Sequence, residues 1–378
     1  MNMIYLDNSA TTKVDESVVE AMLPWLRENY GNASSIYQLG RQARVAIEYA
    51  REEIASLIGA HPAELIFTSG GTESNNTVLK SCTSESNLTD EVLYSAIEHH
   101  AVIHPAKELP PKIRTSALSV DDKGILNLEE FAKRKTSKRT LVSVMHANNE
   151  TGMIQPLEKI RTIAPDALIH TDAVQSFGKI PVNMYEMGMD FASFSAHKIH
   201  GPKGVGALFI RKGIDFKAHQ QGGGQERNRR AGTESPALIV GFQTAARQAV
   251  QEMAARTENM KSAVSLLREL IIQTSALISI NTGLENSLPN ILNVSFLDAE
   301  TLDGEAILQS LDIHGIAASN GSACVSGSLQ PSHVLSAMGR SDAEAKAAVR
   351  FSVSKDTTER DIRMAANALA EVMIALRQ

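Results

Sequence analysis

The sequence predicts an α/β fold in which a mainly parallel sheet lies between helices. Short apolar segments, such as residues 65–67, 91–94 and 140–145, alternate with longer segments whose apolar residues recur at helical spacing. The short segments lack the polar alternation of a half-exposed strand, so the predicted strands are buried on both faces. The chain has 378 residues, of which 43% are hydrophobic, and this is enough for a large core and two domains.

Polar side chains follow each predicted strand directly. Two further strands are expected at 167–170 and 191–194, and both end in residues that can bind ligands. Because open α/β sheets bind ligands at the carboxyl ends of their strands, we expect these side chains to meet at one edge. The residues concerned are Thr72, His99, Asn149, Asp172, Ser195, His197 and Lys198.

A change of pattern after about residue 250 predicts a second, smaller α+β domain. It would contain a helix beginning at 253, strands at 290–296 and 348–353, and a closing amphipathic helix. The apolar positions of that last helix are Ile362, Ala366, Leu369, Met373 and Leu376. We therefore assign residues 14–250 to a large domain, and residues 1–13 together with 251–378 to a small one.

Composition argues against several classes of protein. The net charge of −6 and the 4% aromatic content are untypical of nucleic-acid binders, so no direct nucleic-acid partner is expected. The start lacks the pattern of a secretory signal, and no apolar run is long enough to span a membrane. The two cysteines, Cys82 and Cys324, form neither a disulfide framework nor a metal motif. We expect a cytoplasmic protein with no metal site, in which Cys82 is structural and Cys324 is a free thiol.

The segment TSGGTESNN at 68–76 has the pattern of a phosphate cradle. Paired glycines follow a strand and open a helix, which allows close backbone approach to an anion at the helix N-terminus. Neither a dinucleotide fingerprint nor a Walker loop is present. A capped turn without a ligand explains this segment equally well when it is taken alone.

Lys198 and Asp172 add a second part to this pattern. Lys198 follows a buried strand in SFSAHKIHGPKG, where a desolvated amine can form a Schiff base. Asp172 ends the preceding strand, in HTDAVQS. Pyridoxal-phosphate enzymes need such a lysine for the aldehyde and a carboxylate for the pyridine nitrogen. The combination predicts this cofactor, although a lysine alone is far more often a surface residue.

The sequence closely resembles the cysteine desulfurases of the NifS/IscS type, which are fold-type I pyridoxal-phosphate enzymes of the class V aminotransferase superfamily. The resemblance covers nearly the whole chain and implies a seven-stranded sheet in the large domain. The matching stretches are YLDNSATT (5–12), YGNASS (30–35), FTSGGTESNN (67–76), IEHHAV (97–102), MHANNETG (145–152), HTDAVQS (170–176), SFSAHKIHGPKG (193–204), GGGQERNRRAGT (222–233), PNILNVSF (289–296), SNGSACVSGSLQPSHVL (319–335) and VRFS (349–352). The chain departs from the usual pattern in QGGGQER (221–227), at Tyr37 and in SLQPS.

This resemblance implies a role for each candidate residue. Lys198 would hold the cofactor, Asp172 would pair with its nitrogen, Gln175 with its phenolic oxygen, and His99 would stack on the ring and move protons. Asn149 and Arg350 would bind the substrate L-cysteine. The phosphate would lie among Gly71, Thr72, Glu73, Ser195 and His197, and Thr233 would reach the cofactor site of the partner subunit in a homodimer.

Cys324 would be the nucleophile that takes the substrate sulfur as a persulfide and releases L-alanine. It would pass the sulfur to an acceptor protein, for iron–sulfur cluster assembly or tRNA thiolation. The alternatives are a selenocysteine lyase or another enzyme of the same fold, and a catalytically idle sulfur-carrier or scaffold protein. An aminotransferase has no need of Cys324, and the intact Lys198 and Asp172 argue against an idle protein.

Overall fold

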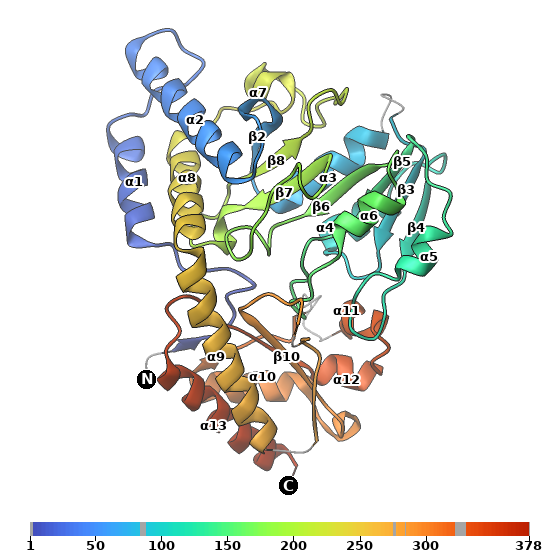
Figure 1. Cartoon of the computed structure of the whole chain (residues 1–378). Helices are drawn as coiled ribbons and strands as arrows, with labels where there is room; N and C mark the ends of the chain where they lie inside the picture. The colour runs from blue at the N-terminus through green and yellow to red at the C-terminus, as the bar shows by residue number, and fades with distance from the viewer. Residues whose placement is uncertain (1–2, 84–87, 275–276, 284, 322–329, 378) are drawn as a thin grey trace.

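The computed structural model describes residues 3–83, 88–274, 277–283, 285–321 and 330–377. Its larger sheet has seven strands in the order β2-β8-β7-β6-β5-β3-β4 (Figure 1). Strand β8 runs antiparallel to both of its neighbours, and the other neighbouring pairs are parallel. The mainly parallel sheet predicted from the sequence is therefore confirmed. Its strands are β2 (Leu65–Thr68), β3 (Glu91–Ser95), β4 (Arg114–Leu118), β5 (Thr140–Ser143), β6 (Leu168–Asp172), β7 (Phe191–Ser195) and β8 (Gly206–Ile210).

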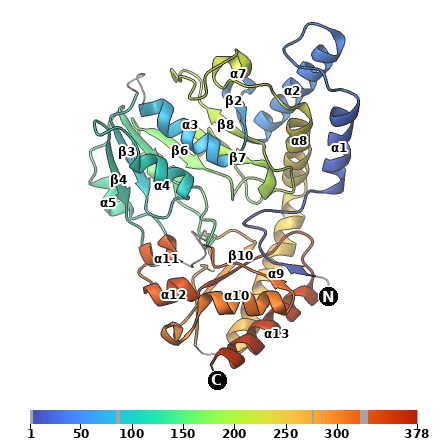
Figure 2. The same ribbon diagram turned by 180° about the vertical axis from the view of Figure 1, so that it is seen from behind.

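Helices cover both faces of this sheet, which explains the continuous apolar strands. In β2, Leu65 and Phe67 pack in one buried cluster, while Ile66 packs in another on the opposite face. The first cluster includes residues of α2 (Gln38–Leu57), α5 (Leu128–Ala132), α6 (Leu157–Ile163) and α8 (Pro236–Gln251), with α1 (Glu16–Arg27) packed outside α8. The second includes α3 (Gly71–Thr83) and α4 (His100–Lys107), which lie in front of the sheet in Figure 2.

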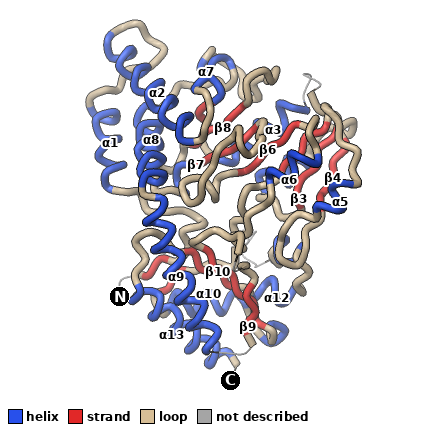
Figure 3. Tube along the Cα trace, in the orientation of Figure 1, coloured by secondary structure: helices blue, strands red, loops and turns tan. Residues whose placement is uncertain are grey.

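A second group of elements surrounds a smaller antiparallel sheet, β12-β10-β9, which Figure 3 shows apart from the larger one. Its strands are β9 (Ile278–Ile280), β10 (Ile291–Phe296) and β12 (Val349–Ser352). It has a buried cluster of its own, to which the helices α9 (Met253–Thr274), α10 (Gly304–Ile313), α12 (Asp342–Ala347) and α13 (Glu359–Leu376) contribute. The predicted closing helix is α13, and its residues Ile362, Ala366, Leu369 and Met373 are buried. We call this group the small unit and the group around the seven-stranded sheet the sheet unit.

The first residues of the chain pack with the small unit. Strand β1 (Ile4–Tyr5) pairs in parallel with β11 (Ile316–Ala317), and Leu6 is buried in the cluster of that unit. The division of the chain at residues 13 and 250 stays a prediction. Two short helices complete the fold, α7 (Gln225–Asn228) and α11 (His333–Ala337). Within the described ranges, every helix is too short or too polar to cross a membrane.

Candidate active site

A cavity of about 390 Å³ lies at the carboxyl edge of the seven-stranded sheet. Residues of both units line it, with Arg350 on β12 facing groups that follow β3, β6 and β7. The sequence-predicted residues that it brings together are Gly71, Thr72, His99, Asn149, Asp172, Gln175, Ser195, His197, Lys198 and Arg350. The convergence of strand-end side chains that the sequence predicted is thus present in the structure.

Asp172 is the last residue of β6 and is almost fully buried. One carboxylate oxygen accepts a hydrogen bond from Asn75 Nδ2 at 2.6 Å, and the other accepts from the backbone N–H of Val174 at 2.9 Å. These two donors fix the carboxylate in the wall of the cavity. Asn75 lies one helical turn after Gly71 on α3 and also lines the cavity.

Lys198 stands in a 3₁₀ turn, Ala196–Lys198, that follows β7 directly. Its Nζ donates to the backbone carbonyl of Ala10 at 2.7 Å and to that of Ser9. Burial lowers the pKa of Lys198 to about 8, helped by the positive charge of Arg350 and opposed by Asp172 and Asp7. A substantial fraction of the amine is therefore neutral at a mildly alkaline pH, which is the form that can attack an aldehyde.

Another part of the cavity lining is suited to an anion. Helix α3 begins at Gly71, and Gly71 and Thr72 line the cavity. A Cβ at Gly71 would lie 2.6 Å from Val174 Cγ2, so only glycine allows this close approach. Ser195 and His197 lie on the same wall, and burial together with Lys198 lowers the pKa of His197 to about 4. The helix N-terminus, the hydroxyls and a neutral imidazole together form a polar cradle for a phosphate.

His99 is the N-cap of α4, and its Nδ1 accepts a hydrogen bond from the backbone N–H of Ala101 at 3.0 Å. Burial lowers the pKa of His99, although the nearby Asp172 opposes this shift. Because Nδ1 is an acceptor, the neutral ring carries its proton on Nε2. The side chain therefore has a fixed tautomer in the wall of the cavity.

Arg350 supplies positive charge from the small unit. Its Nη1 donates to the carbonyl of Asn149 at 3.0 Å, and its Nη2 pairs with Asp7 Oδ1 at 2.6 Å. Its buried Nε has no hydrogen-bond partner among the described residues. This leaves a cationic donor for a carboxylate that enters the cavity.

Three predicted residues are not brought together here. The Glu73 carboxylate pairs with Arg230 at 2.8 Å and 3.0 Å and does not line the cavity. Thr233 lines a separate hollow of about 150 Å³. Cys324 lies outside the described residues.

Two histidines of the cavity wall have no role in the sequence-based prediction. His100 lines the cavity with its ring 4.7 Å from that of His333. His333 Nε2 in turn lies 2.9 Å from the carbonyl of Glu98. The doubled histidine in IEHHAV could have pointed to His100, and the matching stretch SNGSACVSGSLQPSHVL (319–335), 233 residues further along the chain at its histidine, could have pointed to His333.

Glu150 joins the cavity to the residues on either side of the Cys324 segment. It is buried, and it accepts a hydrogen bond from the Ser332 hydroxyl. Gly321 packs on the same side chain, because a Cβ there would lie 2.9 Å from Glu150 Cγ. Burial raises the pKa of Glu150, and the hydrogen bond from Ser332 opposes that shift. Residues 321 and 332 thus meet on one carboxyl group.

The residues of the cavity fit pyridoxal phosphate. A lysine amine of lowered pKa, a buried carboxylate and an anion cradle that a Cβ at Gly71 would obstruct lie around one space. Lys198 would hold the aldehyde, Asp172 the pyridine nitrogen, and Thr72, Ser195 and His197 the phosphate. The free Nε of Arg350 matches the carboxylate of an amino acid substrate.

Known proteins are similar to this chain in sequence and in architecture. The model of the aminotransferase class-V family matches residues 4–364. The chain is 43% identical to the cysteine desulfurase IscS of Dictyoglomus turgidum, covering 99% of this chain and 95% of the relative. It is 42% identical to the cysteine desulfurase NifS of Azotobacter vinelandii, covering 99% and 93%. A solved NifS-like protein superposes with a TM-score of 0.91 at 38% identity, covering 99% of this chain and all of that structure.

Proposed function

The chain belongs to the aminotransferase class-V family and is a pyridoxal-phosphate-dependent cysteine desulfurase. From this premise, we propose a role in the reaction for each residue of the cavity. The observation that carries the proposal is the meeting of Lys198, Asp172 and Arg350 in one cavity. Bound pyridoxal phosphate supplies an electron sink for the substrate carbon. The chain's own residues bind, orient and move protons around it.

Lys198 and His99 perform the proton transfers of the proposed reaction. Lys198 would hold the cofactor at its aldehyde, and its amine would remove the proton from the substrate Cα. The lowered pKa of Lys198 makes its neutral amine available for this step. The Asp172 carboxylate, held by Asn75, would pair with the pyridine nitrogen. His99 would lie against the cofactor and carries a transferable proton on Nε2.

Arg350 and Asn149 bind and orient the L-cysteine substrate. The free Nε of Arg350 receives the substrate carboxylate, while Asp7 and the carbonyl of Asn149 hold its two terminal nitrogens. Since the guanidinium is held from both sides, the substrate meets an oriented donor. This support makes Arg350 a residue of binding and orientation.

Cys324 receives the sulfur. Its thiolate attacks the substrate sulfur, a new S–S bond forms, and the C–S bond breaks with its electron pair left on the carbon side. Protonation of that carbon gives L-alanine, and Cys324 is left as a persulfide. The described residues Gly321 and Ser332, which flank this segment, stand at the cavity through Glu150.

The absorption spectrum and the release of sulfide test this assignment together. The purified protein should absorb in the visible through the Lys198–cofactor linkage, and L-cysteine with a reductant should yield sulfide and alanine in equal amounts. A Cys324→Ala protein should keep the absorption band and lose sulfide release. Unchanged sulfide release from that variant would remove Cys324 from the reaction.

We further propose that the enzyme is a homodimer in which Thr233 reaches the cofactor phosphate of the partner subunit. An exposed apolar face on α1, α2 and their connection supports a second copy as the occupant. Ile36 is 90% exposed, Tyr30 76% and Val45 69%. Trp25 and Tyr49 line a broad groove beside them. Monomers rarely expose such a group of large apolar side chains.

The dimer is tested by a substitution on this face. Val45→Asp should convert the protein to a monomer in analytical ultracentrifugation, whereas Ile374→Asp, at a similarly exposed position of α13, should not. Mixed subunits test the shared site. Lys198→Ala and Thr233→Ala chains that are refolded together should regain activity, because one of the two sites then has both residues. Failure to regain it would place Thr233 in its own subunit's site.

The sulfur passes to an acceptor protein in the proposed function. Iron–sulfur cluster assembly and tRNA thiolation are the two candidate destinations that the resemblance implies. Co-purification of the enzyme from its own host, after loading with radiolabelled cysteine, would identify the acceptor by the label that it takes up. Label that stays on Cys324 in the presence of the whole extract would argue against transfer to a protein.

A further inference from the structure

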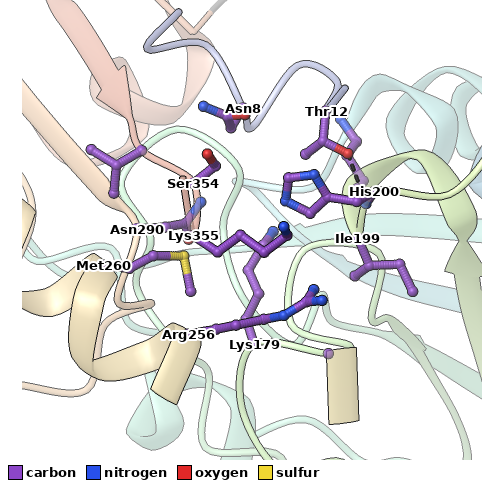
Figure 4. A pocket seen from close by; sticks show the side chains of 13 residues that line it. Asn8, Thr12, Lys179, Ile199, His200, Arg256, Met260, Asn290, Ser354 and Lys355 are labelled. Carbon is purple, nitrogen blue, oxygen red and sulfur yellow. Dashed lines mark hydrogen bonds between the residues drawn. The ribbon is translucent and has the colours of Figure 1, made fainter. Parts of the chain in front are cut away.

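A second lysine, Lys179, is buried behind the cavity and takes no part in the proposed chemistry. Lys179 is only 6% exposed. Its side chain lines a hollow of about 20 Å³ (Figure 4), which Lys198 also lines. Its backbone is fixed on both sides. Gly178 has a φ of +73° and no room for a Cβ, which would lie 2.8 Å from Ala249 Cβ. The Thr257 hydroxyl donates to the carbonyl of Lys179 at 3.1 Å.

Among the described residues, the side-chain hydrogen bonds of Lys179 go to one neutral residue, Gln175. Its Nζ donates to the backbone carbonyl of Gln175 at 3.0 Å and to Gln175 Oε1 at 3.1 Å. Among the described residues, no carboxylate forms an ion pair with it. A buried amine without an acidic partner is costly, because burial disfavours its charged form. Burial and the charges of Lys198 and Arg350 lower the pKa of Lys179 to about 7.

These contacts determine which way the Gln175 amide faces. The ammonium form of Lys179 has only N–H donors to present to the amide, so it selects the oxygen, Oε1. At the other end, Gln175 Nε2 donates to the carbonyl of Ser9 at 2.9 Å, and a carbonyl can only accept. Rotating the amide by half a turn would place its NH2 group against the N–H donors of Lys179. It would also place the amide oxygen against the carbonyl oxygen of Ser9. The orientation is therefore set by chemistry at both ends.

Gln175 is thereby left with one N–H to offer the cavity. Its amide nitrogen carries two hydrogens, one of which goes to the Ser9 carbonyl. That same carbonyl also accepts from Lys198 Nζ, and both Gln175 and Lys198 line the cavity. A continuous set of hydrogen bonds thus runs from Lys179 through Gln175 and Ser9 to Lys198.

We propose that Lys179 is a positioning residue that holds the Gln175 amide with its N–H toward the phenolic oxygen of the cofactor. This inference rests on the proposed role of Gln175. The N–H stabilises negative charge on that oxygen and so sets how firmly the neighbouring Lys198 linkage holds its proton. Lys179 acts on the linkage through Gln175 and does not touch the cofactor.

The test is a double-mutant cycle on the visible absorption of the cofactor-loaded enzyme. Each variant is titrated with pH in the absence of substrate, and the midpoint of the change in the visible band is recorded. Lys179→Met and Gln175→Ala should each raise this midpoint, by about 0.5 to 1 pH unit, which corresponds to the loss of one hydrogen bond. The double variant should shift no further than Gln175→Ala alone, because the two residues act in series.

Lys355→Met is the matched control for loss of charge. Lys355 lines the same small hollow from the small unit, and its side chain pairs with Asp15 and Asp356 and does not contact Gln175. Its removal should leave the midpoint in place. Additive shifts in the double variant, or an equal shift in Lys355→Met, would show that charge acts directly and would overturn the inference.

Two further outcomes separate this inference from the proposed function. If Gln175→Ala leaves the midpoint unchanged, the assigned role of Gln175 is wrong, and the role of Lys179 falls with it. If Gln175→Ala shifts the midpoint and Lys179→Met does not, only the role of Lys179 is wrong. Should Lys179→Met fail to fold, Lys179→Arg keeps the donor and has the adjacent hollow for its extra atoms, and it should retain the wild-type midpoint.

Discussion

The two walls of the active-site cavity are built in different ways. On the sheet side, Asp172 and Lys198 stand at the ends of neighbouring parallel strands; Asp172 is held by Asn75, and Lys198 by the carbonyl of Ala10 from the N-terminal segment. On the other side, Arg350 belongs to the small unit and is held by Asp7, 343 residues away in sequence. The backbone positions of Asp172 and Lys198 are thus set by one sheet, whereas the position of Arg350 in the cavity depends on how the two units meet. We infer that the first wall governs the chemistry and the second governs substrate binding.

The largest effect should come from removing the amine of the sheet wall. Lys198→Ala should abolish the visible band and reduce sulfide release by about a thousandfold or more, since both the covalent link and the general base are lost. Steady-state assays of sulfide and absorption spectra would measure it. Lys203→Ala, which changes an exposed lysine of the same turn, should behave as wild type. A Lys198→Ala enzyme with appreciable activity would break the assignment of chemistry to this wall.

A change in the opposite wall should act on binding. Arg350→Gln should raise KM for L-cysteine by about tenfold to a hundredfold, the value of a charge-assisted hydrogen bond, while kcat changes little. The cofactor spectrum should remain, since no cofactor contact is removed. If kcat fell and KM stayed constant, Arg350 would act in the chemical step and not in substrate binding. The functional difference between the two walls would then disappear.

The pH dependence of cofactor capture tests how the walls are coupled. Because burial and Arg350 lower the pKa of Lys198 to about 8, the neutral amine becomes available as pH rises through that value. Apoenzyme should capture pyridoxal phosphate at a rate that increases with pH and is half-maximal near pH 8. In Arg350→Gln a positive neighbour is lost, so the midpoint should move to higher pH. A midpoint that stays in place would mean that the two walls do not communicate.

The smallest effect on activity is expected at Cys82, behind the sheet. This thiol is fully buried on α3, and burial raises its pKa, so it should resist alkylation in the folded protein. Cys82→Ala should keep activity within about twofold and lower the stability to unfolding by about 1 kcal/mol. In a Cys324→Ala protein, labelling with a maleimide should appear only after denaturation. Rapid labelling of the native variant would contradict the burial of Cys82.

The sequence predicted β2, β3, β5, β6 and β7 and missed β4 and β8. Strand β4 is mostly polar and exposed at the edge of the sheet, so it lacks the apolar run that identifies a central strand. Strand β8 follows a Gly/Pro turn within five residues of the site motif and was not recognised as an element of its own. Both strands join the sheet by pairing with strands that are distant in sequence. A local sequence pattern carries no information about such pairing.

The candidate site shows the same limit. Thr72 and Lys198 could be predicted because strand ends converge at one sheet edge, and both line the cavity. Glu73 was predicted from its place at the start of α3, but its carboxylate turns to Arg230, 157 residues later. The contact between Asp7 and Arg350 joins the two ends of the chain and has no local signature. Long-range pairing therefore decides the details that the motifs leave open.

Gly321 and Ser332 are both anchored on Glu150, and this limits how the segment between them can vary in length. Both residues are fixed against the same buried carboxyl group, so the distance between the two anchors is set by the fold. The span that the intervening chain can cover then depends on the number of residues between them. A longer segment between the same two anchors costs little extra free energy, since closure entropy grows only slowly with length. Under the proposed role of Cys324, insertions between these anchors would change which recipients its thiol meets, while Lys198, Asp172 and Arg350 keep their places.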